Sequence, residues 1–82
     1  MQIKVLYFSA VRELAGRSEE VLEIPHVVRT VADLAAHLAK LHPPLAGRLG
    51  PVRFARNEEF VEGAAVLAAG DVVAILPPVA GG

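Results

Sequence analysis

The last residues of the chain, 76–82 with the sequence LPPVAGG, present the group best placed for chemistry, the carboxylate of Gly82. A carboxylate is a poor electrophile. It carries a transferable group only after another enzyme converts it into an acyl-adenylate with ATP. A sulfur donor that attacks such an adenylate leaves a terminal thiocarboxylate, whose sulfur is a soft nucleophile. The tail supplies no acid or base, so it indicates a carried group and not a catalytic site.

The residues before Gly82 suit delivery of that terminus into a pocket of another protein. Six extended residues reach at most about 20 Å. The two terminal glycines lack Cβ atoms and therefore fit a narrow channel. Pro77 and Pro78 fix φ and hold each preceding residue extended. They reduce the entropy lost on docking, which is roughly 1 to 2 kcal/mol for each ordered residue. We expect a folded domain over residues 1–76 and an extended tail over residues 77–82.

The spacing of the remaining polar residues predicts neither a metal site nor a catalytic acid and base pair. His37 and His42 are five residues apart and do not share a helical face, and the chain has no cysteine. We interpret them, together with His26, as solvated histidines and expect no metal site. The glutamates between residues 58 and 62 are interpreted as a solvated turn and not as an acid and base pair.

Composition narrows the class of protein. A chain of 82 residues with 54% apolar and 21% charged residues is expected to fold as one domain with one core. The net charge of −1 is spread along the chain, which predicts neither a nucleic-acid partner nor a membrane partner. No signal peptide or membrane-spanning segment is evident, so a cytoplasmic location is the expectation.

The N-terminal third predicts a pair of strands joined by a short helical piece. Residues 2–8 are rich in β-branched and aromatic residues, and alternation assigns Ile3, Val5 and Tyr7 to the core. Ser9 is predicted to cap the helical piece, and Gly16 to end it in the left-handed conformation. The sequence EEVLEIP then predicts the return strand, with Leu22 and Ile24 on one side, stopping before a proline.

The clearest helix begins after Thr30, which is predicted to be its N-cap with Asp33 three residues later. Pro43 and Pro44 are predicted to end it, and the following sequence PLAGRLG has the composition of a loop. The apolar residues at helical spacing are Val31, Leu34, Ala35, Leu38 and Leu41.

Three further strands are predicted toward the C-terminus. The sequence VRFAR indicates a strand, NEE a turn and FV a short return strand. The last strand follows a turn at Gly70 and Asp71, with Val73 and Ile75 on its core face.

One helix cannot cover both faces of a four- or five-stranded sheet, so one face must remain open to solvent or to a partner. By alternation that face carries Leu6, Phe8 and Leu76, with Phe60 near them. Exposed apolar residues grouped in this way are typical of a binding surface.

This order of strands around one main helix resembles the ubiquitin-like β-grasp, an α+β fold with a mixed sheet of four to five strands. The sequences GDVVAILPPVAGG and IKVLYFSAVRELAG resemble the two ends of the small subunits of molybdopterin synthase, a family of sulfur carriers in molybdenum-cofactor synthesis. The resemblance spans the whole chain.

The resemblance implies a definite role for the tail. Gly82 would be adenylated by a ubiquitin-activating-like adenylyltransferase using ATP and converted to a thiocarboxylate, with a sulfurtransferase as the sulfur source. The tail would enter the large subunit, which holds the catalytic side chains, and donate sulfur to the cyclic pterin precursor of the molybdopterin dithiolene. No bound cofactor is implied, and two copies of each chain form a heterotetramer in this family. The residues implied in tail insertion are Pro77, Pro78, Val79, Ala80 and Gly81, and those facing the large subunit are Phe8, Arg12, Phe60 and Leu76.

Three other functions remain open from the sequence. The same tail chemistry serves ubiquitin-like modifiers, which are joined to lysines of target proteins, and sulfur carriers for thiamine, cysteine or tRNA thiolation. The third is a plain β-grasp interaction module, for which removal of Gly81 and Gly82 would change nothing.

Overall fold

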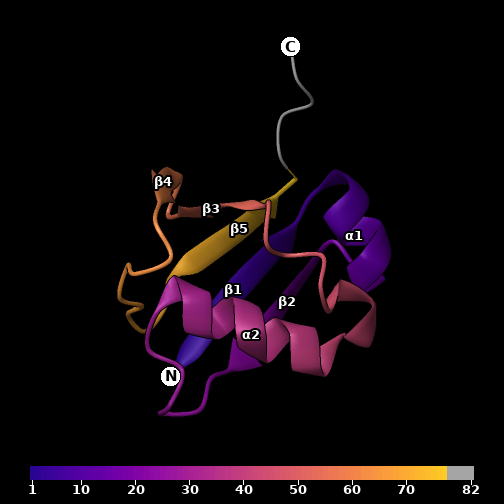
Figure 1. Cartoon of the computed structure of the whole chain (residues 1–82). Coiled ribbons are helices and arrows are strands. Elements are labelled where there is room, and N and C mark those ends of the chain that lie inside the picture. Colours follow the sequence, from indigo (N-terminus) through magenta and orange to yellow (C-terminus); the bar gives the residue numbers. More distant parts are fainter. Residues whose placement is uncertain (78–82) are drawn as a thin grey trace.

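The computed structural model describes residues 1–77 of the 82-residue chain. Five strands form one mixed sheet in the order β2-β1-β5-β3-β4, and two α-helices and a short 3-10 helix complete the fold (Figure 1). The predicted α+β architecture is therefore confirmed. The elements are β1 (Gln2–Tyr7), α1 (Ser9–Ala15), β2 (Glu19–Glu23), α2 (Val31–Leu41), η1 (Pro43–Leu45), β3 (Arg53–Arg56), β4 (Glu59–Val61) and β5 (Val72–Leu76).

The last strand lies in the middle of the sheet, with β1 on one side and β3 on the other (Figure 1). It runs parallel to β1, with Tyr7 opposite Ile75, and antiparallel to β3, with Arg53 opposite Leu76. The C-terminal ends of β1 and β5 therefore meet at the same edge of the domain. Pro77 follows at that edge, and the rest of the predicted tail, residues 78–82, lies outside the described residues.

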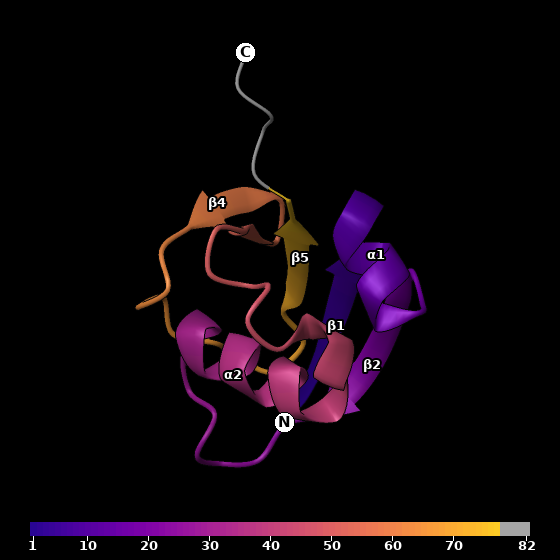
Figure 2. The same cartoon turned by 45° about the vertical axis from the view of Figure 1, so that its right-hand side comes forward.

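The core lies between one face of the sheet and the two helices, which are on the same side of it (Figure 2). The alternation predicted for β1 and β5 is confirmed, because their inward side chains are fully buried or nearly so. We call this side of the sheet the inner face and the other side the outer face. The residues with no exposed surface are Ile3, Val5, Val31, Leu34, Leu38, Leu45, Val73 and Ile75.

The predicted capping of α2 is confirmed. The hydroxyl oxygen of Thr30 accepts a hydrogen bond from the backbone N–H of Asp33 at 3.1 Å, and the Asp33 carboxylate accepts one from the N–H of Thr30 at 3.1 Å. The backbone donors of Arg29 and Thr30 also lower the pKa of Asp33. At the other end, Leu41 is 45% exposed because it lies on the last turn, beyond the core.

Two local predictions are wrong. Phe8, not Ser9, is the N-cap of α1, and Ser9 is already in the helix with a φ of 50° and no capping hydrogen bond. The chain turns one residue early because the Phe8 N–H donates to the carbonyl of Ile75, while its own carbonyl accepts from the N–H groups of Val11 and Arg12. The segment predicted as a loop after α2 includes η1, whose Leu45 is fully buried. Gly16 does end α1 with a φ of 76°, as predicted.

The β3–β4 hairpin turns on Asn57 and Glu58, both with positive φ, which is the two-residue turn that matches the twist of a hairpin. The predicted turn was one residue longer, since Glu59 belongs to β4. The Asn57 amide donates to the buried carboxylate of Asp71 at 3.0 Å and accepts from the N–H of Val72 at 2.9 Å. These bonds tie the hairpin to the start of β5. No helix within residues 1–77 has the length and apolar character needed to cross a bilayer.

Candidate docking surface and tail exit

The outer face of the sheet carries a continuous set of apolar side chains over β1, β5, β3 and β4. The register explains this grouping, because Leu6 lies opposite Ala74 and Ala55 lies opposite both Ala74 and Phe60. An open hollow of about 580 Å³ lies over them. We call these residues the outer apolar surface: Leu6, Phe8, Ala55, Phe60, Val72, Ala74 and Leu76.

Three of the four predicted partner-binding residues belong to this surface. Phe8 is 43% exposed, Phe60 is 62% exposed and Leu76 is half-buried. Phe8 follows the end of β1 and Leu76 ends β5, so the parallel pairing of these strands brings both to the edge where Pro77 leaves the sheet. Their exposure matches the prediction from alternation, whereas their role in binding stays a prediction.

Arg12, the fourth residue, does not line the hollow. It lies exposed on α1, and its carbonyl accepts the hydrogen bond from Gly16 that closes the helix. The link between Arg12 and the outer apolar surface is helix α1, because Phe8 belongs to that surface and is the N-cap of the helix that carries Arg12.

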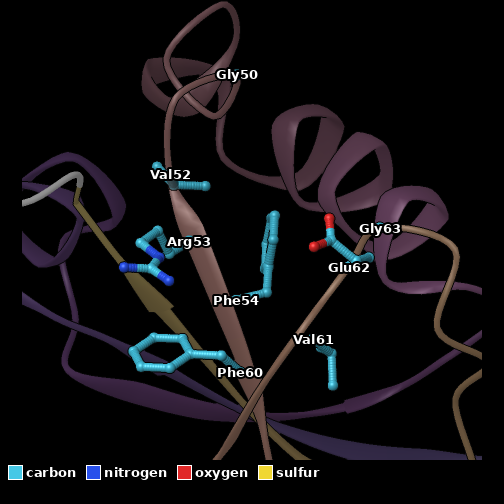
Figure 3. Close-up of a pocket in the computed structure, with 8 residues that line it drawn as sticks. All are labelled: Gly50, Val52, Arg53, Phe54, Phe60, Val61, Glu62 and Gly63. Carbon is cyan, nitrogen blue, oxygen red and sulfur yellow. The ribbon is translucent and has the colours of Figure 1, made fainter.

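Arg53 was missed by the sequence interpretation, although it lies directly opposite Leu76 on β3. Its guanidinium carbon lies 4.4 Å from the centroid of the Phe60 ring. Figure 3 shows Arg53 alongside that ring, while the next residue of β3, Phe54, lies on the other side of the strand. The turn at Asn57 and Glu58 fixes this register, so recognising a two-residue turn would have put both side chains on the outer face.

A second polar group lies on the inner face and corrects the prediction for His42. Its side chain is only 13% exposed, and its Nε2 lies 2.5 Å from Oε2 of Glu20. The Tyr7 hydroxyl donates to the same carboxylate oxygen, and the ring of His42 meets that of Tyr7 edge-on. Arg17 reaches the other oxygen of Glu20 at 3.1 Å. His42 is therefore part of a closed polar cluster and not a solvated histidine.

The pKa values of this cluster shift in opposite directions. Burial raises the pKa of Glu20, but the hydrogen bonds from Tyr7 and His42 and the charge of Arg17 outweigh burial, and the pKa is lowered overall. Burial, followed by the hydrogen bond to Glu20, raises the pKa of Tyr7 well above its ordinary value. Glu20 is thus held as a carboxylate and Tyr7 as a neutral phenol.

Within residues 1–77 no three histidine, aspartate or glutamate side chains are grouped so that they could hold a metal ion. The predicted turn glutamates, Glu58, Glu59 and Glu62, are all exposed.

Comparison with known proteins places these features in a family. The sequence profile of the ThiS family matches residues 5–82. The chain belongs to the ThiS family. It is 43% identical to the molybdopterin synthase sulfur carrier subunit of Chlamydomonas reinhardtii, and the match covers 100% of both chains.

Solved structures of similar proteins agree with the fold. A putative molybdopterin converting factor subunit 1 from Pyrococcus furiosus is 34% identical, with a TM-score of 0.83, over 96% of this chain and 99% of that one. The small archaeal modifier protein 1 of H. volcanii is 27% identical, with a TM-score of 0.84, over 95% and 98% of the two chains. The ThiS domain described here is a ubiquitin-like β-grasp.

Proposed function

We propose that this protein is the sulfur-carrier subunit of a molybdopterin synthase and works in the cytoplasm. The observation that supports this most is the full-length match to the Chlamydomonas sulfur carrier subunit, because it includes the tail as well as the domain. The family match likewise runs through residue 82.

In the proposed reaction the carboxylate of Gly82 attacks ATP on an adenylyltransferase, and pyrophosphate leaves. A persulfide sulfur of the sulfurtransferase then displaces AMP to give an acyl disulfide, and a thiol reductant cleaves the S–S bond to leave a thiocarboxylate on Gly82. In the large subunit this sulfur attacks an electrophilic carbon of the cyclic pterin precursor and the carbon–oxygen bond at that carbon breaks, with the oxygen leaving as a phosphate ester oxygen or as water. Water then cleaves the resulting thioester to restore the carboxylate, and a second sulfurated carrier repeats the transfer at the neighbouring carbon. The carrier contributes a delivered atom, and the acid and base side chains belong to its partners.

The outer apolar surface is suited to hold the carrier on the large subunit while the tail is inserted. Phe8 and Leu76 border the point where Pro77 leaves the sheet, so a partner that covers them also receives the tail. Burying a side chain the size of Phe8 or Phe60 contributes roughly 1.5 to 3 kcal/mol. Arg12 is assigned a polar contact near this surface, and two copies of each subunit form the proposed heterotetramer.

The decisive experiment is an intact-mass measurement of the full chain after incubation with the activating enzyme, ATP and a sulfur source. We expect one oxygen to be replaced by sulfur, and we expect no change in a matched variant that lacks Gly82. The sulfurated chain, mixed with the large subunit and the pterin precursor at two or more carriers per precursor, is then expected to yield the dithiolene product, because each carrier delivers one of the product's two sulfur atoms. An unchanged mass, with an activating enzyme that works on another carrier, would overturn the proposal.

A second function, conjugation to other proteins, is favoured by the likeness to small archaeal modifier protein 1. It uses the same activated Gly82 but transfers it to a lysine amine. Higher-mass conjugates in cells that disappear when Gly82 is deleted would support it, whereas their absence, together with thiocarboxylate formation, leaves the carrier function alone.

A further inference from the structure

Arg53 lies at the rim of the outer apolar surface, at the edge from which the tail leaves. Its Cα is paired with that of Leu76, the last residue of β5, and its side chain is exposed. Its guanidinium lies against the ring of Phe60 (Figure 3), and the guanidinium carbon is 4.4 Å from the ring centroid.

This contact favours one orientation of a side chain that would otherwise rotate freely, by about 0.5 to 1 kcal/mol at an exposed ring. A free arginine carries about 2 kcal/mol of rotamer entropy, and a guanidinium stacked on a ring keeps the N–H donors in its plane available. The orientation stacked on Phe60 is therefore favoured before any partner arrives.

Two other cations of the sheet are already used by the domain. Lys4, also on the outer face, pairs with Glu19 at 2.7 Å, and Arg56 on the inner face donates to the carbonyl of Val66 at 2.6 Å. Within residues 1–77 no carboxylate lies within 4.0 Å of the Arg53 guanidinium.

A partner that covers Phe60 must also remove water from the guanidinium stacked on it. Burying a charge without a partner is strongly unfavourable, whereas a carboxylate that accepts two parallel N–H bonds compensates for the lost water. A protein with an apolar pocket but no acidic group at its rim would therefore bind this surface poorly.

We propose that Arg53, held by Phe60, is a specificity-determining docking residue that pairs with an aspartate or glutamate at the rim of the pocket into which the partner receives the tail. This inference rests on the proposed function, because it assumes that the outer apolar surface binds the tail-accepting large subunit. It adds the partner's chemistry: an apolar depression for Phe60 bordered by a carboxylate, beside the channel mouth.

The test measures the affinity of the full chain for the large subunit at two salt concentrations. We expect Arg53→Glu to weaken binding by about 30-fold or more at low salt and to reduce the salt dependence. Arg53→Lys keeps the charge but loses the planar donors, so a loss of about threefold to tenfold is expected. The matched control is Arg29→Glu, which reverses the same charge beside Met1 at the start of β1, whereas Leu76 ends the parallel strand β5, and it should change affinity by less than about twofold.

A second variant tests whether Phe60 orients Arg53. Phe60→Leu keeps an apolar side chain but removes the ring, so the effect of Arg53→Glu should be several-fold smaller in that background. Thermal unfolding of the variants at positions 53 and 60 is expected to match that of the unchanged protein.

The inference is overturned if Arg53→Glu and Arg29→Glu bind the large subunit with the same affinity. It is also overturned if Arg53→Glu lowers the affinity equally in the Phe60→Leu background, or if Arg53→Glu lowers it by breaking self-association of the chain. Thiocarboxylate formation on Gly82, measured on the same samples, separates this failure from failure of the proposed function. A normally sulfurated and normally donating Arg53→Glu carrier refutes the inference alone, whereas a chain that is never sulfurated refutes the proposed function.

Discussion

Both faces of the sheet carry an aromatic ring next to charged groups. On the inner face those groups are paired with one another, whereas on the outer face the charged group has no ion-pair partner among the described residues. On the inner face, Tyr7 and His42 meet at the carboxylate of Glu20, whose second oxygen is bonded to Arg17. On the outer face, Arg53 lies on Phe60, and no carboxylate among the described residues comes within 4.0 Å of its guanidinium.

The difference separates residues that complete the fold from residues that await a partner. The inner cluster is enclosed by β1, β2 and the end of α2, and each of its charges has a counterpart within the chain. The outer pair is oriented but incomplete, and it lies beside half-exposed apolar residues. We infer that substitutions on the inner face act on stability and that those on the outer face act on binding.

The largest expected effect is on the inner face. Leu34 is fully buried, so Leu34→Ala removes apolar contacts and leaves a cavity, and it should lower the free energy of unfolding by about 2 to 5 kcal/mol. Leu41→Ala, on the same helix but 45% exposed, is the matched control and should cost below about 1 kcal/mol. Urea unfolding followed by circular dichroism measures both. Equal losses would mean that α2 does not pack as described.

A smaller effect, on binding alone, is expected from Phe8→Lys. The change removes a large side chain from the outer apolar surface, so affinity for the large subunit should fall by about 10-fold to 100-fold. The midpoint of urea unfolding should stay the same, because Phe8 is not part of the core. Val27→Lys, at an 81% exposed position, should leave both quantities unchanged. Loss of folding in Phe8→Lys would contradict the division between the two faces.

The smallest effect is expected from Glu20→Gln, at about 1 kcal/mol at neutral pH, because the amide still accepts one hydrogen bond. Since the pKa of Glu20 is lowered in the folded state, its carboxylate stabilises the protein above the unfolded-state pKa of about 4.3. This contribution is lost as the pH falls through the folded-state pKa.

The measurement is the free energy of unfolding between about pH 3 and pH 7, where Glu20→Gln should show a flatter profile than the unchanged protein. Glu19→Gln, its half-exposed neighbour on the outer face, is the control and should leave most of the pH dependence in place. An unchanged profile in Glu20→Gln would show that the inner cluster does not hold its carboxylate as described.

Much of the fold follows from local sequence patterns. Alternation was sufficient to assign Val5 and Val73 to the core and Phe8 to the open side, because side chains in a strand must point to alternate faces. Thr30 and Asp33 predicted the start of α2 because a capping box requires only residues three apart.

The parts that could not be predicted depend on contacts between distant residues. Glu20 and His42 are 22 residues apart, and only the packing of β2 against the end of α2 brings them together. Likewise, the sequence alone does not show that Arg53 lies near the tail, because only the strand register places it opposite Leu76. The roles of residues 78–82 remain predictions from the sequence and the family.

The central position of β5 has a mechanical consequence. The tail continues from a strand that is bonded to β1 on one side and to β3 on the other. A force on the tail along the strand axis would load both rows of hydrogen bonds in shear, all at the same time. In unzipping, by contrast, the hydrogen bonds would break one after another. A partner that draws the tail into a tight channel would thus be pulling on the best-anchored strand of the domain.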